Sequence, residues 1–157
     1  NSSKRMALLP FCTHVMCGHG GNDYSTNQTI SDTITRLNTE WQKLKTGGKP
    51  VYMTLEMPKT NSTDSYATVA NQTPKAGYET GGTWRDVFNA HINASAGTRF
   101  DAVITGLNEV AADAAKPDRW IAAGTVDGVH PSKPVQIALA SPLATYLTPI
   151  RAAYEAA

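Results

Sequence analysis

The chain has 157 residues, of which 41% are hydrophobic and 17% are charged, and its formal net charge is +1. This length suits one domain that buries roughly 70% of its unfolded surface, and the composition is that of a globular chain rather than a disordered one. The small net charge gives no electrostatic case for nucleic acid or an anionic membrane as a partner. No apolar run approaches the roughly 18 residues of a membrane span, and no signal peptide is recognisable.

The predicted elements alternate between strands and helices. Residues 11–18 are expected to form a short buried strand that ends in a glycine. Residues 29–45 are expected to form an amphipathic helix, because apolar side chains recur at spacings of three and four. The later elements are a strand at 50–57, a helix at 83–93, a strand at 99–107, irregular or short helical pieces up to 132, and a long last helix that Pro142 kinks or splits.

A polar stretch at residues 58–82 is too long for a plain connector, so we expect it to be functional or mobile. The alternation around it predicts an α/β fold, a three-layer α/β/α sandwich with a parallel, flavodoxin-like sheet. Ligands of such sheets gather at the carboxyl ends of the strands. The segment "GHGGND", residues 18–23, lies at such an end, where a functional site is expected.

Several single residues have ordinary structural interpretations. Cys12 and Cys17 are five apart, which places them on opposite faces of a strand, so we expect two small buried side chains and no disulfide. His14 is expected in the core with its hydrogen bonds satisfied, and His91 on an exposed helix surface. Asn108 follows the third strand and is expected to cap a helix or to line the rim of a site.

The acceptor pattern for N-glycosylation, Asn-x-Ser/Thr, occurs more often than expected by chance. It slightly favours a secreted or extracytoplasmic location, but the pattern alone is weak evidence and the localisation stays open. Its asparagines are Asn1, Asn27, Asn61, Asn71 and Asn93.

The segment "DGVHPS", residues 127–132, contains a carboxylate three residues before a histidine. Asp127 is expected to accept a hydrogen bond from Nδ1–H of His130, which leaves Nε2 free as a general base toward a serine or a water. Pro131 is expected to fix the backbone after the histidine and to help begin the last helix. The pattern Asp-x-x-His is common, so a turn aspartate beside a surface histidine is the alternative interpretation.

The two segments together resemble two blocks of the SGNH hydrolases, also called the GDSL esterase/lipase family. "GGND" resembles the Gly-x-Asn-Asp block, and "DGVHP" resembles the Asp-x-x-His block, in the same order and at a similar separation. The resemblance extends from residue 9 to residue 150. It implies that residues 1–157 are the C-terminal part of a single SGNH hydrolase-like domain.

The resemblance also implies roles for individual residues. Asn22 would donate its side-chain amide to an oxyanion hole, and Gly20 and Gly21 would let the backbone turn so that this amide faces the substrate. Asp127 and His130 would complete a Ser-His-Asp triad. Two neighbours of the first block, His19 and Asp23, are expected at the rim of the site.

The sequence departs from the family pattern in lacking a Gly-Asp-Ser-Leu-like block that carries the nucleophile. Ser2 and Ser3 follow neither a strand nor a Gly-Asp pair, so neither is assigned as the nucleophile. The serine, the first strands of the sheet and a second oxyanion donor are therefore expected on an N-terminal companion segment or chain. This chain alone is expected to be inactive.

The resemblance implies a serine ester hydrolase that acts on a small acyl ester or an acetylated carbohydrate and needs no cofactor or metal. Transfer of the acyl group to a sugar instead of water is a variant of that reaction. A metal-assisted hydrolase is the first alternative, with His19, Asp23, Asp127 and His130 as ligands. A non-catalytic binding or structural fragment is the second alternative.

Overall fold

The structure is a computed structural model, and it describes residues 7–18 and 28–156. The chain forms two compact units. The first, here called the sheet unit, comprises Asn1–Glu56 and Val87–Val103. The second, here called the hairpin unit, comprises Met57–Asp86 and Ile104–Ala157. Each unit is described by itself.

A parallel three-stranded sheet lies at the centre of the sheet unit. Its strands are β1 (Val15–Cys17), β2 (Val51–Thr54) and β5 (Ala102–Ile104), in the order β1-β2-β5. β1 and β2 run parallel with Val15 opposite Val51. Within β2, the side chains of Val51 and Met53 face the core, and both residues are fully buried. The predicted parallel sheet is therefore confirmed.

All three strands are shorter than predicted, and local contacts explain where two of them stop. Before β1, Pro10 lies in the first turn of a short 3-10 helix, η1 (Leu9–Phe11), so Phe11 is helical and exposed rather than part of the strand. After β2, the side chain of Asn89 bonds both backbone groups of Glu56, accepting from its N–H at 2.8 Å and donating to its carbonyl at 3.1 Å. At Glu56, a side-chain amide thus makes the backbone hydrogen bonds that a neighbouring strand would otherwise make.

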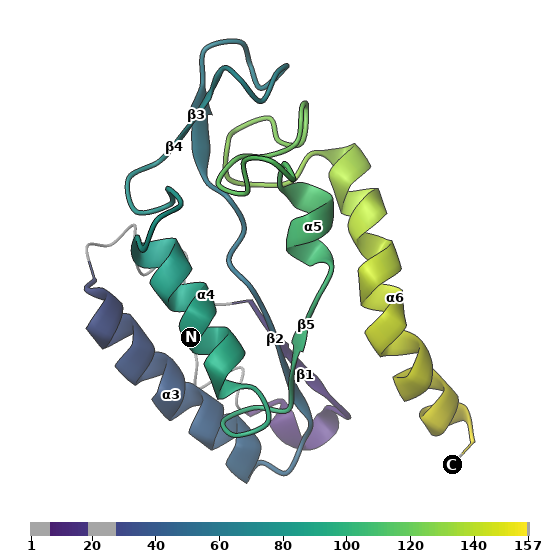
Figure 1. Cartoon of the computed structure of the whole chain (residues 1–157). Helices are drawn as coiled ribbons and strands as arrows, with labels where there is room; N and C mark the ends of the chain where they lie inside the picture. Colours follow the sequence, from purple (N-terminus) through teal and green to yellow (C-terminus); the bar gives the residue numbers. More distant parts are fainter. Residues whose placement is uncertain (1–6, 19–27, 157) are drawn as a thin grey trace. The chain divides into compact units, whose positions relative to one another are not determined.

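Two helices, α3 (Ile30–Thr46) and α4 (Trp84–Ser95), lie side by side along the sheet of this unit (Figure 1). α3 begins at the predicted place because the hydroxyl of Thr29 accepts a hydrogen bond from the N–H of Asp32. Trp41 is fully buried between α3 and the sheet, 3.1 Å from the sulfur of Met53 and edge-on to Phe100.

The structure corrects the predicted environments of both histidines. His91 is half-buried rather than exposed, because its ring stacks on Trp41 and its Nε2 lies 2.9 Å from Oδ1 of Asn38. His14 stacks on Tyr52, but its buried Nδ1 has no hydrogen-bond partner among the described residues. The expectation that the hydrogen bonds of His14 are satisfied is therefore wrong for Nδ1.

Both cysteines are free thiols, as predicted. Cys17 is buried at the end of β1, and burial raises the pKa of its thiol to about 11. Cys12 is only half-buried, contrary to the prediction, because it lies just after η1 rather than inside a strand.

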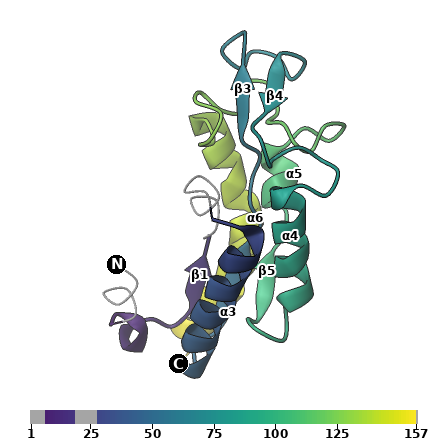
Figure 2. The same ribbon diagram turned by 90° about the vertical axis from the view of Figure 1, so that its left-hand side faces the viewer.

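The hairpin unit contains the polar stretch at 58–82, which is not a plain loop. It forms an antiparallel hairpin of β3 (Thr60–Ser62) and β4 (Gln72–Pro74), visible in Figure 2. Asp64 organises the turn between these strands by accepting hydrogen bonds from the side chains of Ser62, Thr68 and Asn71. These hydrogen bonds hold the pKa of Asp64 well below its usual range.

The hairpin is tied to the segment that precedes the last helix. The buried amide of Gln72 bonds both backbone groups of Trp120, accepting from the N–H and donating to the carbonyl, each at 3.1 Å. The Trp120 side chain is itself fully buried.

The remaining helices are α5 (Leu107–Ala111) and α6 (Lys133–Glu155), which pack against each other. α6 runs as one helix, although Pro142 and Pro149 lie inside it. Gly106 makes the close packing at Pro142 feasible, because a Cβ there would lie 2.8 Å from the Pro142 side chain, and its φ is +87°. The predicted alternative of a split helix is therefore wrong.

Candidate active site

Five of the predicted site residues lie outside the described part of the chain. They are the expected oxyanion donor and its two glycines, together with the two rim residues: Asn22, Gly20, Gly21, His19 and Asp23. Their roles therefore stay predictions. The other two predicted residues, Asp127 and His130, are described.

Asp127 and His130 form the hydrogen bond that the sequence predicted. Oδ2 of Asp127 lies 2.7 Å from Nδ1 of His130. The other carboxylate oxygen, Oδ1, accepts from the backbone N–H groups of Val129 and His130, each at 2.8 Å. The carboxylate therefore holds both the ring and the backbone of the histidine.

The charge of Asp127 determines the tautomer of the imidazole. The hydrogen bond from the His130 ring, followed by those from the backbone N–H groups of His130 and Val129, holds the pKa of Asp127 well below its usual range. Asp127 is thus ionised at neutral pH. Because an ionised carboxylate can only accept, Nδ1 must carry the proton, and Nε2 of the neutral ring then has its lone pair available.

The far side of the imidazole is open to solvent. The side chain of His130 is 75% exposed, and that of Asp127 is 47% exposed. Within the described part of the chain, Nε2 of His130 makes no hydrogen bond. An oriented imidazole with an unengaged Nε2 is the arrangement that a general base needs.

Gly128 anchors this turn to the rest of the hairpin unit. Its carbonyl accepts from the N–H of Thr60 at 2.9 Å and from Nε1 of Trp120 at 3.2 Å. Its φ is +77°, and a Cβ at this position would lie 1.9 Å from the carbonyl oxygen of Thr60. Only glycine fits there. The glycine inside "DGVH" was a usable signal for a tight turn, but no sequence pattern indicated Trp120 or Thr60 as its partners.

The start of α6 differs from the prediction. The helix begins at Lys133 after Ser132, and the proline in its first turn is Pro134. Pro131 lies before the helix, where it forms a bridge with Thr125. The proline after the histidine therefore closes the turn that carries His130 and does not begin the helix.

Among the described residues there is no group of three or more His, Cys, Asp or Glu side chains that could hold a metal ion. Two members of the alternative metal set, His19 and Asp23, lie outside those residues. In the same part of the chain, no helix combines the length and apolar character needed to cross a membrane.

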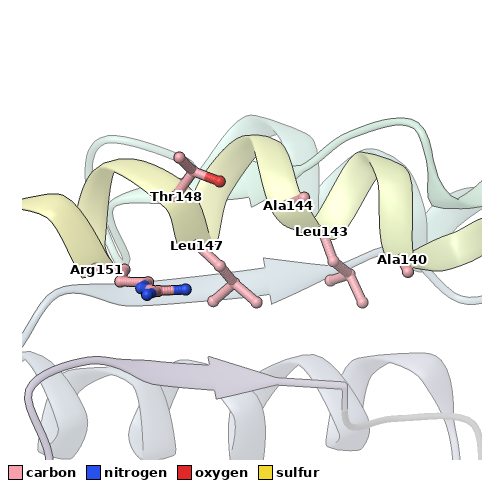
Figure 3. A pocket seen from close by; sticks show the side chains of 6 residues that line it. All are labelled: Ala140, Leu143, Ala144, Leu147, Thr148 and Arg151. Atoms are coloured by element: carbon pink, nitrogen blue, oxygen red, sulfur yellow. The ribbon is translucent and has the colours of Figure 1, made fainter.

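A second feature of the hairpin unit is a shallow hollow along α6. Figure 3 shows Leu143 and Leu147 projecting from the same side of the helix. Ala140 and Ala144 line the hollow between and beside them, and Arg151 marks its far end. Leu147 is 45% exposed. The spacing of these residues at three and four is that of one apolar helix face.

Comparison with known proteins gave one informative result. No protein-family model matches the chain, and no match was found among curated proteins. Among solved structures, the crystal structure of TesA superposes with a TM-score of 0.57 at 18% sequence identity, over 95% of this chain and 73% of the TesA chain. The chain has the fold of TesA. The predicted α/β fold, with its parallel sheet and helices, is thereby confirmed.

Proposed function

We propose that this chain supplies the aspartate and the histidine of the catalytic triad, Asp127 and His130, in a serine ester hydrolase of the SGNH type. The observation that carries the proposal is the 2.7 Å hydrogen bond between Asp127 and His130, with Nε2 unengaged by the described residues. The likeness to TesA supports the fold that such an enzyme needs. In this proposal, residues 1–157 are the C-terminal part of a single domain.

The proposed reaction proceeds through an acyl-enzyme. Nε2 of His130 takes the proton of a serine hydroxyl while the serine oxygen attacks the ester carbonyl. The proton then passes from His130 to the departing alcohol as the ester C–O bond breaks. Water, deprotonated by the same imidazole, releases the acid and regenerates the serine. Asp127 stabilises the imidazolium at both stages.

Asn22 has the role of oxyanion donor in this proposal. A side-chain amide carries no net charge and stabilises the negative oxygen of the tetrahedral intermediate, and one such donor contributes on the order of 3 kcal/mol. The substrate is a small acyl ester, such as an acetyl group on a carbohydrate. No cofactor takes part in any of these steps.

The serine belongs to a companion in this proposal, meaning a polypeptide segment outside the present sequence. The apolar face of α6 supports a companion, because the half-buried Leu143 and the exposed Leu147 are stabilised when another segment covers them. We assign the companion to this face. The TesA chain also extends beyond the part that superposes.

The test uses this chain, affinity-tagged and expressed in its natural source. The purified material is treated with a fluorophosphonate probe, which labels activated serines, and is assayed with p-nitrophenyl acetate. We expect a labelled serine on a co-purifying polypeptide and hydrolysis that His130→Gln abolishes. The 157-residue chain alone should stay at background.

Three outcomes would contradict the proposal. Robust hydrolysis by the chain alone would show that its nucleophile is internal. Activity that a chelator abolishes and the fluorophosphonate does not affect would indicate metal-assisted hydrolysis. Absence of any labelled partner, with no effect of His130→Gln, would leave a non-catalytic fragment.

A further inference from the structure

Thr125 lies two residues before Asp127 and had no role in the sequence interpretation. The residue is only 2% exposed, whereas the two residues of the proposed acid–base pair are exposed to solvent. The large majority of buried hydroxyls in proteins are hydrogen-bonded. The partners of the Thr125 hydroxyl lie in the turn that carries His130.

The hydroxyl of Thr125 bonds the turn in two directions. It donates to the carbonyl of His130 at 2.7 Å and accepts from the N–H of Gly128 at 2.9 Å. A hydroxyl has one proton, so the longer approach to Oδ1 of Asp127, at 3.3 Å, is a secondary interaction. Within the described residues, one side-chain oxygen thus contacts Asp127, Gly128 and His130 of the Asp-x-x-His turn.

These bonds fix the backbone of His130 at both ends. Its N–H is held by Oδ1 of Asp127, and its carbonyl is held by the Thr125 hydroxyl. Because the backbone is fixed and the histidine side chain is short, Nδ1 of His130 lies within hydrogen-bond distance of Oδ2 of Asp127. The isolated bridge between Thr125 and Pro131 closes the same turn from the other side.

From this geometry we infer that Thr125 is a positioning residue, whose hydroxyl holds the His130 imidazole in the Nδ1–H tautomer that leaves Nε2 as the base. Thr125 acts through His130 and touches no substrate. The inference rests on the proposed function for its catalytic meaning. Its structural content can be measured on the 157-residue chain without a companion.

The test compares Thr125→Val with Thr125→Ser in chains labelled with ¹⁵N-histidine. Valine preserves the shape and removes the hydroxyl, whereas serine keeps the hydroxyl. NMR shifts of the two ring nitrogens give the tautomer ratio of His130. We expect the ratio of Nδ1–H to Nε2–H to fall about five-fold in Thr125→Val, the factor that corresponds to one ordinary hydrogen bond. Thr125→Ser should stay close to the wild type.

Thr33→Val is the matched control, because Thr33 is also fully buried and its hydroxyl has no partner among the described residues. It should leave the tautomer ratio of His130 unchanged. A folded Thr125→Val chain with the wild-type ratio would overturn the inference, because a purely structural hydroxyl would lower the melting temperature without changing the imidazole.

A second measurement covers the case in which Thr125→Val fails to fold. In the wild-type chain, the hydroxyl proton of Thr125 should exchange slowly and show a nuclear Overhauser effect to the amide of Gly128. Fast exchange without that effect would overturn the inference. Loss of the proposed function has a different signature: no hydrolysis by the wild-type complex, with the Thr125 and His130 signals unaltered.

Discussion

At the scale of single residues, Asp127 uses its two oxygens for different purposes. Oδ1 bonds backbone N–H groups and Oδ2 bonds the ring of His130. In Asp127→Asn, the amide oxygen can keep one set of bonds, but the amide nitrogen cannot accept from Nδ1–H. The imidazole would then favour the tautomer with its proton on Nε2, where it cannot act as a base.

We therefore expect Asp127→Asn to lower kcat of the companion complex by about 10⁴-fold with little change of fold, as a wrong tautomer does in a serine triad. Rates with p-nitrophenyl acetate and a far-ultraviolet circular dichroism spectrum measure the two effects. A rate within tenfold of the wild type would show that Asp127 does not orient the base.

Gly128 has both a positive φ and no space for a side chain. Gly128→Ala should lower the free energy of unfolding by about 2–5 kcal/mol, because it combines a left-handed alanine with overpacking against the Thr60 carbonyl. Gly82→Ala is the matched control, since Gly82 has φ +86° in the same unit but nothing within 4 Å of the added Cβ. That control should cost about 1–2 kcal/mol. Urea titration of both variants measures the difference in the free energy of unfolding. An equal decrease in both variants would show that the backbone of the turn shifts to accommodate a side chain at residue 128.

At the scale of elements, the contact between α3 and α4 contains a titratable group. Burial, with a smaller contribution from the positive charge of Arg99, lowers the pKa of His91. The folded state therefore favours the neutral ring, which stacks on Trp41. A lowered pKa contributes stability that is present above the unfolded value of about 6.5 and is lost as the pH falls through the folded value.

The wild-type chain should thus lose stability between pH 7.5 and pH 5, and His91→Gln should lose less, because glutamine does not titrate in this range and its amide can still donate to Asn38. Urea midpoints of both chains at the two pH values give the comparison. A larger loss in His91→Gln than in the wild type would contradict the assigned direction.

The same two scales show what the sequence could predict. The sequence located α3, α4 and α6 to within a few residues, and α3 by its periodicity, because helix spacing and caps are local signals. The strands came out shorter, since their ends depend on partners far away in the chain, such as the Asn89 amide at Glu56. The hairpin at 60–74 was missed because three-residue strands carry almost no periodic signal.

The residues of the candidate site also divide into those that local sequence spacing predicts and those that it does not. Asp127 and His130 were found because their hydrogen bond closes over three residues, a spacing that is visible in the sequence. Thr125, Trp120 and Thr60 hold the turn through bonds that follow no local pattern. The predicted oxyanion donor Asn22 lies outside the described residues and stays a prediction.

At the scale of the whole molecule, the proposal requires that another polypeptide segment cover the apolar face of α6. Burial of a leucine side chain contributes roughly 1.5–3 kcal/mol, and Leu147 is nearly half exposed in this chain. Leu147→Ala should therefore weaken binding of the serine-bearing companion about tenfold, which corresponds to 1.4 kcal/mol. The fold of the free chain should change little, because an exposed side chain contributes less to the core.

The measurement is a titration of tagged chain against the companion recovered by fluorophosphonate labelling, with bound label as the signal. Thr145→Ala serves as the control, because Thr145 is exposed on the same helix and does not line the hollow. It should bind like the wild type. If Leu147→Ala binds as tightly as Thr145→Ala, the companion does not cover this face. The acid–base pair would then have to meet its serine through another surface. Among the described residues, the hydrogen-bond partners of His130 are Thr125 and Asp127, both in the hairpin unit, and neither belongs to α6.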